Sequence, residues 1–228
     1  MVMLVGCGGN APSDAPDPRL TYRATMYRKD ETGAGVVLPG VKICVRERSD
    51  LPCATTGPNG VAALEVPLAD ASLSFELAGF EHMIVPYARQ SVGGLQLLMS
   101  EQPKLETNVT AVGLRFPSAP LVGVNILRDG IVDTSGTVAR ISVAAEGPIY
   151  AGLGGFDALD VSLTATTIAG FAVFGNMAEG EVEITVEHPT YLCAPSAFGG
   201  GWPTAEQNRL RAPVVNGADT IVAFECRP

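Results

Sequence analysis

The sequence is poor in lysine, histidine and aromatic residues. Of its 228 residues, 6% are aromatic, one is tryptophan and two are histidine, and the lysines are Lys29, Lys42 and Lys104. Acidic residues outnumber basic ones by 24 to 15, which gives a formal net charge of −9. Because proteins that bind a nucleic-acid backbone present a basic patch or stripe, this composition argues against nucleic acid as a partner.

Long apolar runs and helical repeats are also missing. Beyond the first residues, no apolar run approaches the ~18 residues that a membrane-spanning helix requires. Charged residues amount to 17%, well below the content of a helical bundle or coiled coil. A disordered chain is disfavoured because 46% of the residues are hydrophobic. Glycine (26 residues) and proline (17 residues) are abundant instead, as in turn-rich β-proteins.

The chain begins with a short apolar run that ends in Leu4-Val5-Gly6-Cys7, and the Pro-rich segment 8–18 follows. This arrangement resembles the lipobox of bacterial lipoproteins, in which cleavage precedes the cysteine and the thiol carries the lipid. The resemblance implies a mature chain that starts at Cys7 and is anchored through it to the membrane of the cell envelope. Six residues are too few for a signal peptide, so we expect the true start codon upstream of Met1. The alternative is an apolar terminus with an incidental cysteine.

Cysteine counting supports an exported protein. Without Cys7, four cysteines remain, an even number that suits an oxidising compartment. Four cysteines allow three pairings, of which we expect the two local ones, Cys44 with Cys53 and Cys193 with Cys226. The alternative use of four cysteines is a zinc site. The sequence has no CxxC motif and no Cys/His pair at ligand spacing, so we expect no metal.

Short apolar alternations recur between turn signals from Leu20 onward. A period of two indicates strands with one buried face, and turns such as Gly57-Pro58-Asn59-Gly60 separate them. Their length and spacing predict a β-sandwich or a barrel. The alternating segments of the first unit are 21–27, 41–45, 61–66, 73–77 and 95–99.

A different period follows the first unit. Ser100 is a candidate N-cap, and a proline three residues later is tolerated in a first helical turn. Leu105, Val109 and Val112 lie at helical spacing and form one apolar stripe. The pattern predicts a connecting helix over 100–113.

The second half of the chain repeats the first. The alignment sets Thr55 and Thr56 opposite Thr166 and Thr167. The second unit differs by a long insert, 144–164, which we expect to be a loop, and by a tail hairpin around the turn Asn216-Gly217. The matched segments are 21–27 with 121–126, 40–43 with 136–141, 52–64 with 163–174 and 73–77 with 182–186.

The motif order of the first unit resembles a known family. Its motifs are Pro39-Gly40-Val41, then Thr55-Thr56 followed by Gly60, then a segment that ends in Ala78-Gly79-Phe80. This order resembles the carboxypeptidase-regulatory-like domains, which are seven-stranded transthyretin-like sandwiches. The resemblance covers 19–99 and, more loosely, 114–228. It implies an all-β protein of two tandem Ig-like or transthyretin-like antiparallel β-sandwiches joined by a short helix, with 1–18 as signal remnant and linker.

The resemblance also sets expectations about function. Domains of this family serve folding, docking or spacing, and no peptidase catalytic segment accompanies them here. Related adhesin repeats carry a Lys–Asn isopeptide bond assisted by a glutamate. The second unit has no lysine after Lys104, and Lys42, which has Glu76 as a candidate helper, alternates with apolar neighbours and is expected to face solvent. We therefore expect no such bond.

Patterns that indicate catalysis are missing from the sequence. His82 and His188 lie in no HExxH motif, and no GxSxG motif is present. We expect both histidines, and Glu81 beside the first, in surface turns. The carboxylates of 179–183 alternate with apolar residues, which predicts the solvated face of a strand rather than an acid–base pair. No calcium or phosphate loop is present, so we expect no enzyme activity and no cofactor.

Trp202 is the candidate ligand contact. It follows Gly199-Gly200-Gly201, which we expect to be a flexible loop. An exposed tryptophan stacks on a sugar or a protein partner, and the alternative is a tryptophan partly buried as a plug. These features together predict a non-enzymatic, lipid-anchored envelope or surface protein that serves adhesion, docking or spacing with another envelope protein. The alternative is a carbohydrate-binding module that takes a saccharide.

Overall fold

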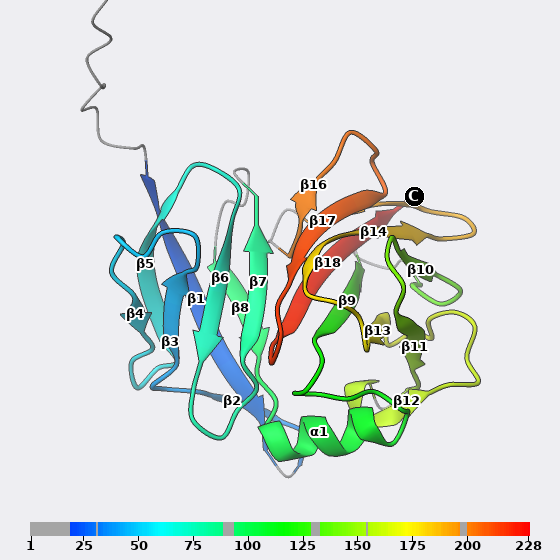
Figure 1. Cartoon of the computed structure of the whole chain (residues 1–228), viewed down its shortest axis with the longest axis horizontal. Coiled ribbons are helices and arrows are strands. Elements are labelled where there is room, and N and C mark those ends of the chain that lie inside the picture. Colours follow the sequence, from blue (N-terminus) through cyan, green and yellow to red (C-terminus); the bar gives the residue numbers. More distant parts are fainter. Residues whose placement is uncertain (1–18, 31, 89–93, 129–132, 154, 197–199) are drawn as a thin grey trace, which may run out of the picture.

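The chain folds into two β-sandwich modules that lie side by side (Figure 1). This computed structural model describes residues 19–30, 32–88, 94–128, 133–153, 155–196 and 200–228. The regular structure of these residues consists of strands, one short α-helix and one 3₁₀ turn, which confirms the predicted all-β class. The expected lipidation site Cys7, with the whole segment 1–18, lies outside the described residues.

The first module is a sandwich of two layers. In one layer β1 pairs with all three other strands, and in the facing layer the strand order is β4-β3-β6-β7. Alternate residues of the first strand, Tyr22, Ala24 and Met26, point into the core, as the period-two pattern predicts. The strands are β1 (Arg19–Lys29), β2 (Gly35–Val37), β3 (Lys42–Val45), β4 (Ala54–Thr55), β5 (Val61–Pro67), β6 (Ala71–Glu76), β7 (Met83–Tyr87) and β8 (Gly94–Leu98).

The second module is also a two-layered sandwich. One layer has the order β10-β14-β17-β16, and the other has the order β12-β11-β13-β9-β18, with β15 also paired to β18. A 3₁₀ helix, η1 (Gly155–Ala158), precedes β12. The strands are β9 (Leu121–Arg128), β10 (Val138–Ile141), β11 (Glu146–Ala151), β12 (Leu159–Asp160), β13 (Phe171–Gly175), β14 (Gly180–Glu187), β15 (Leu192–Pro195), β16 (Trp202–Pro203), β17 (Arg209–Val214) and β18 (Asp219–Arg227).

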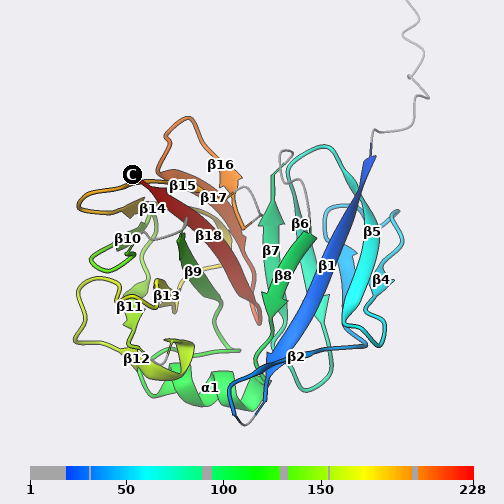
Figure 2. The ribbon, with the colours of Figure 1, turned by 180° about the vertical axis from the view of Figure 1, so that it is seen from behind.

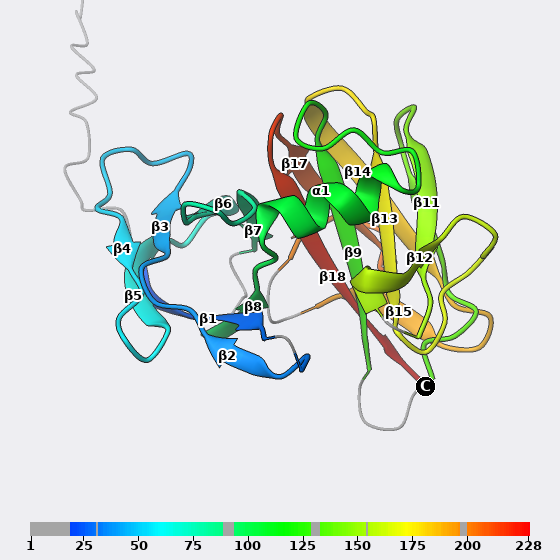
Figure 3. The same ribbon diagram turned by 90° about the horizontal axis from the view of Figure 1, so that it is seen from below.

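One sheet runs through both modules, because β7 pairs with β18 in parallel. Met83 stands opposite Asp219 in this pairing, and Ile84 stands opposite Thr220. Met83 points into the first core. Thr220 lies on the same face of β18 as Val222 and Phe224, which belong to the second core. The two cores therefore lie on opposite faces of the shared sheet (Figure 3).

The α-helix α1 (Gln102–Thr110) lies within the predicted range 100–113 and leads into the second module. Leu105 and Val109 are fully buried, as the apolar stripe predicts. The expected N-cap is wrong: Glu101 holds that position, with no side-chain capping bond. Ser100 instead remains in extended chain, where its backbone pairs with the backbone and carboxylate of Glu81.

A threonine and a glycine close one turn of the first module. The Thr56 hydroxyl accepts a hydrogen bond from the Val41 N–H (2.9 Å) and donates one to the Leu38 carbonyl (2.8 Å). Four residues later, Gly60 has a φ of +71°, and its carbonyl accepts the Met26 N–H (2.8 Å). A Cβ at Gly60 would lie 2.8 Å from the Met26 carbonyl oxygen, so only glycine fits without a shift.

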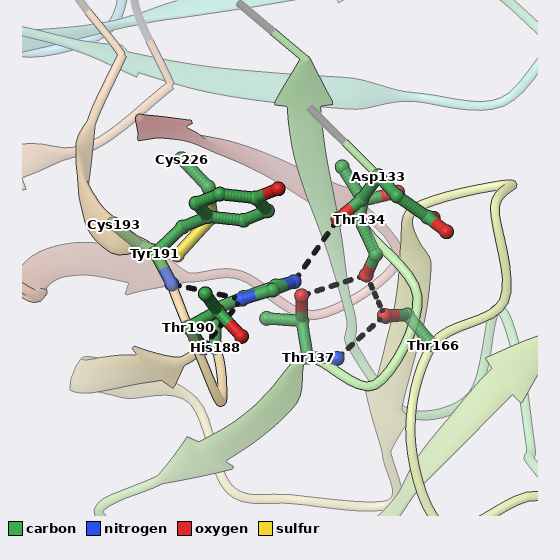
Figure 4. The surroundings of a disulfide bond; sticks show 9 residues. All are labelled: Asp133, Thr134, Thr137, Thr166, His188, Thr190, Tyr191, Cys193 and Cys226. Atoms are coloured by element: carbon green, nitrogen blue, oxygen red, sulfur yellow. Dashed lines mark hydrogen bonds between the residues drawn. A yellow bond between two sulfur atoms is a disulfide. The ribbon is translucent and has the colours of Figure 1, made fainter. Parts of the chain in front are cut away.

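The second module repeats this arrangement (Figure 4). The Thr166 hydroxyl accepts a hydrogen bond from the Thr137 N–H (3.1 Å) and donates one to the Thr134 carbonyl (2.5 Å). Gly170, again four residues later, has a φ of +60°, and its carbonyl accepts the Ile126 N–H (2.7 Å). The equivalent contacts confirm the internal repeat.

The same contacts correct the register of the repeat by one residue. Thr56, not Thr55, is the counterpart of Thr166. Thr55 is exposed and takes no part in the turn. In the corrected register Gly57 stands opposite Thr167, so the hydrogen bond that the Thr167 hydroxyl donates to the Ala151 carbonyl (2.8 Å) has no equivalent in the first module. Each unit has two adjacent threonines, and only the buried one closes the turn. The sequence alone does not show which of the two is buried.

The segment 144–164 is not a loop insert, which corrects the expectation. It forms β11 and β12 with η1 between them, and β11 pairs with β13. Apolar–polar alternation does not indicate β11 because both of its faces are covered. Tyr150 belongs to the sandwich core, while Ile149 and Ala151 pack on the opposite side with the helix. A strand buried on both faces lacks apolar–polar alternation.

The tail does not form a hairpin either. The turn at Asn216-Gly217 is present, with a φ of +72° at the glycine, but β17 pairs with β14 and β16 while β18 pairs with β9, β7 and β15. Ala212 and Val222 point into the same core from opposite layers. The turn therefore carries the chain from one layer to the other.

Both predicted disulfides are confirmed. Cys44 is bonded to Cys53, nine residues apart, and Cys193 to Cys226, thirty-three residues apart. Each bridge lies within one module. The second joins paired positions of β15 and β18.

Candidate functional site at the junction of the two modules

The segment that carries Trp202 connects the two modules. The indole N–H donates a hydrogen bond to the Ala71 carbonyl of the first module (3.0 Å). The backbone N–H groups of Gly200 and Gly201 both donate to the Pro86 carbonyl of the first module (2.8 and 3.0 Å). Residues 200–202, which we call the latch, thus run along the edge of the first module rather than forming the expected free loop, and Gly199 lies outside the described residues.

The glycines of the latch are required by close approach. Gly200 has a φ of +99°, and a Cβ there would lie 2.7 Å from the backbone nitrogen of Ala223. A Cβ on Gly201 would lie 2.4 Å from a methyl carbon of Leu210. The glycine run reflects tight packing between modules, because any side chain would push the latch away from the second module.

The Trp202 ring is half-buried and lies beside a row of paired arginine and glutamate side chains. The Arg211 guanidinium lies 5.9 Å from the ring centroid, within the range of a cation–π contact. Arg211 also pairs with Glu181 (3.0 Å), and Arg209 pairs with Glu183 (3.2 Å) on the same sheet face. These carboxylates lie on the solvated strand face that the sequence predicted.

Two buried carboxyl groups lie where β7 and β18 meet. Glu81 is 3% exposed and Asp219 is 2% exposed. The Glu81 carboxylate accepts the Ser100 N–H (2.7 Å), and the Asp219 carboxylate accepts the Gly123 N–H. Asp219 Oδ1 has no hydrogen-bond partner in the described part of the chain.

Burial shifts the titration of both groups. Burial raises the pKa of Asp219 to about 7. It also raises the pKa of Glu81 well above its usual value, and the charge of Asp219 adds to that effect. The sequence interpretation placed Glu81 in a surface turn, which is wrong, and it did not single out Asp219. A polar residue at a sheet junction gives no local sequence signal, because its burial depends on a distant strand.

A cavity of about 590 Å³ lies beside these carboxyls, and we call it the junction cavity. Strands β18 and β9 line it with Ile221 and Leu127, and β8 lines it with Leu98. Figure 2 shows the course of these three strands. Leu98 and Leu127 are 42% and 37% exposed, so part of their apolar surface faces solvent at the cavity. Other lining residues are Glu81, Asp219, Phe156, Phe171 and Lys29.

His82 lies near a serine and a glutamate, but the group is not a catalytic triad. Its Nε2 atom is 2.9 Å from Ser74 Oγ and 3.8 Å from Glu76 Oε1. A triad needs the carboxylate on the other ring nitrogen, where it orients the base. Burial, the main cause, lowers the pKa of His82, and Glu76 opposes the shift. Lys42, on the neighbouring strand, is exposed as expected.

His188 fixes the turn before Cys193 (Figure 4). Its Nδ1 atom accepts the backbone N–H groups of Thr190 and Tyr191, each at 3.0 Å. Nδ1 is therefore unprotonated, and Nε2 carries the proton that is donated to the Asp133 carbonyl (3.0 Å). The histidine thus has a structural role, and its ring also contacts the Tyr191 ring, with the centroids 4.5 Å apart and the planes tilted by 32°.

The described residues contain no group of three or more His, Cys, Asp or Glu side chains that could hold a metal ion. Within the same ranges, no helix has the length and apolar character needed to cross a membrane.

Comparison with known proteins gives distant structural likenesses. No family model matches the sequence, and no curated protein matches it. The GBS52 minor pilin of Streptococcus agalactiae is 10% identical, with a TM-score of 0.28 over 90% of this chain and 94% of that one. The TIE protein of Bacillus anthracis has a TM-score of 0.29 at 11% identity, over 92% of this chain and 35% of that one. A family-26 carbohydrate-binding module from Eubacterium rectale, in complex with maltoheptaose, has a TM-score of 0.21 at 10% identity, over 90% of each chain. We draw no functional conclusion from likenesses at these scores.

Proposed function

We propose that this protein is a non-enzymatic docking or spacing protein of the bacterial cell envelope, anchored through a lipid on Cys7. Its two modules, of the carboxypeptidase-regulatory-like type, act as one body. The observation that carries the proposal is the junction, where a shared sheet and the latch join the modules. A spacer must hold its ends at a fixed separation, and two domains that move freely relative to each other would not.

The disulfides support an exported location. Such bonds persist in oxidising compartments and are rare in the cytosol. Both pairs are formed in this structure, and Cys7 remains outside them. The sequence around Cys7, with its following Pro-rich linker, supports lipid attachment at that residue.

Metabolic labelling tests the anchor. The gene, with its upstream in-frame codons, is expressed in a bacterial host supplied with an alkyne fatty acid, beside the variants Cys7→Ser and Ser13→Ala. We expect label and membrane fractionation in the wild type and Ser13→Ala, and neither in Cys7→Ser. Equal labelling of Cys7→Ser, or an unlabelled wild type, would reject lipid attachment at Cys7.

Saccharide binding at Trp202 is the less favoured alternative. The indole N–H is already bonded to Ala71, and the Arg211 guanidinium lies over the ring. These contacts favour a role in holding the modules together over stacking on a sugar. A glycan-array screen distinguishes the two: a glycan bound by the wild type and lost in Trp202→Ala, with unchanged melting temperature, would restore the sugar hypothesis.

A further inference from the structure

We propose that the junction cavity binds a ligand with a primary ammonium group on an aliphatic chain. The ammonium would lie against Glu81 and Asp219, and the chain would lie along Leu98, Leu127 and Ile221. This inference goes beyond the proposed envelope role and does not depend on the lipid anchor.

Among the residues that the structure describes, no basic side chain forms an ion pair with Glu81 or Asp219 at the carboxyl end of the cavity. Asp219 Oδ1 is buried and unpaired among the described residues, which is costly unless a donor is supplied. Glu81 lies close enough for its pKa to respond to the charge of Asp219. Lys29, the base that lines the cavity, is exposed. An ammonium group supplies a positive charge and three donors in a small volume.

The rest of the cavity suits an apolar chain. Its lining includes Leu98, Leu127, Ile221, Phe156 and Phe171. A volume of about 590 Å³ falls within the range of small-molecule sites, roughly 300–1,000 Å³. Covering the exposed parts of Leu98 and Leu127 would remove apolar surface from water, which favours binding.

Two other ligand classes fit less well. A calcium ion needs six to eight oxygen ligands, and the described residues offer no cluster of three acidic, histidine or cysteine side chains. An anionic amphiphile such as a fatty acid would bring a third carboxylate to a pair that already repels charge. The combination of buried acids and aliphatic walls favours the aliphatic ammonium.

Calorimetric titration with octylammonium at pH 7 tests the proposal, with octanol and octanoate as chain-matched controls. We expect octylammonium to bind at one site, octanol about tenfold more weakly, because it lacks the charge, and octanoate not at all. Equal affinity for octanol and octylammonium, or no binding of octylammonium, would overturn the proposal.

Two variants locate the site. Asp219→Asn keeps the side-chain shape and should weaken octylammonium binding by about tenfold or more. Leu127→Trp fills the cavity from the β9 side and should abolish binding even if Asp219→Asn folds poorly. The matched controls are Asp70→Asn, on the exposed β5–β6 turn, and Leu192→Ala, an exposed leucine on β15. Unchanged binding in Leu127→Trp would place the ligand elsewhere.

Proton release gives an independent readout. Because burial raises the pKa of both acids, the pair holds a proton near pH 6 that an incoming ammonium should displace. Titration in two buffers of different ionisation enthalpy measures that release. We expect up to one proton per ligand in the wild type and less in Asp219→Asn, while equal release in both would overturn the assignment of the head group to Asp219.

Discussion

The two modules use the same device at one turn and differ at their edges. In each, a buried threonine hydroxyl bonds one backbone N–H and one carbonyl, and the carbonyl of a glycine four residues later accepts an N–H from the first strand of the module. In each, the first and last strands are parallel neighbours, β1 with β8 and β9 with β18. The differences lie outside this frame: the second module adds β11, β12 and a helix-covered core. The comparison teaches that the turn defines the repeat, while sheet edges are free to acquire new partners.

The edge of the first module at β7 forms the junction between the two modules. In the second module the strand equivalent to β7 is β17, which is paired on its far side with β16 of the same module. In the first module, β7 has β18 of the other module there instead. The same strand position therefore closes one module and joins the two.

Removal of the disulfides should give the largest difference between modules. The chain-entropy model predicts a loss of about 4 kcal/mol for Cys193→Ala/Cys226→Ala, against about 2.5 kcal/mol for Cys44→Ala/Cys53→Ala, because the longer loop loses more entropy when closed. Urea unfolding of the two double variants measures both values. The same loss in both would show that loop length is not the deciding factor.

The repeat glycines should follow. Gly170→Ala places a Cβ 2.4 Å from the Ile126 carbonyl oxygen, and Gly60→Ala places one 2.8 Å from that of Met26. We expect each to cost about 3 kcal/mol in unfolding free energy, with Gly170→Ala the worse.

Gly79→Ala is the matched control for those two variants. Gly79 has a φ of +85° but no atom within 4 Å of a Cβ, so it reports the cost of the backbone conformation alone. A cost equal to that of Gly170→Ala would show that crowding contributes nothing.

Loss of the threonine hydroxyl should affect both modules alike. Thr56→Val and Thr166→Val each leave a buried N–H without its acceptor, and we expect each to lower the unfolding free energy by about 2 kcal/mol. Thr55→Val, at the exposed position next to Thr56, should change it little. A large effect at Thr55 and none at Thr56 would restore the register read from the sequence.

Local patterns predicted much of this fold. Period-two alternation located the strands around Val61 and Leu73, helical spacing located α1, and cysteine counting gave both bridges. These features are set by residues near one another in sequence. The Thr–Gly turn was also found, with an error of one residue that only burial could correct.

The structural features that the sequence did not predict depend on contacts between distant strands. The burial of Glu81 and Asp219 arises from the pairing of β7 with β18, and no periodicity reports which strand lies beside an edge. Trp202 and its glycines looked like a flexible binding loop, because close packing and flexibility both favour glycine. The 144–164 strands were missed since burial on two faces removes alternation.

The acid pair should make stability depend on pH in an unusual direction. A folded pKa raised to about 7 means that the contribution of Asp219 is fully present below about pH 4, its unfolded range, and is lost as pH rises through 7. Between pH 4 and 7 we expect the wild type to lose at least about 1.4 kcal/mol, equivalent to one pKa unit, relative to Asp219→Asn. Chemical unfolding at each pH measures this, and parallel profiles would exclude Asp219 as the cause.

The central claim is that the shared sheet and the latch make the two modules one rigid body. Backbone residual dipolar couplings of the isotope-labelled protein test it directly, measured for β1–β8 and for the strands of the second module. We expect a single alignment tensor to fit both sets in the wild type, and Trp202→Ala, which removes the Ala71 contact, to loosen the agreement. Two wild-type tensors of clearly different magnitude would contradict the account.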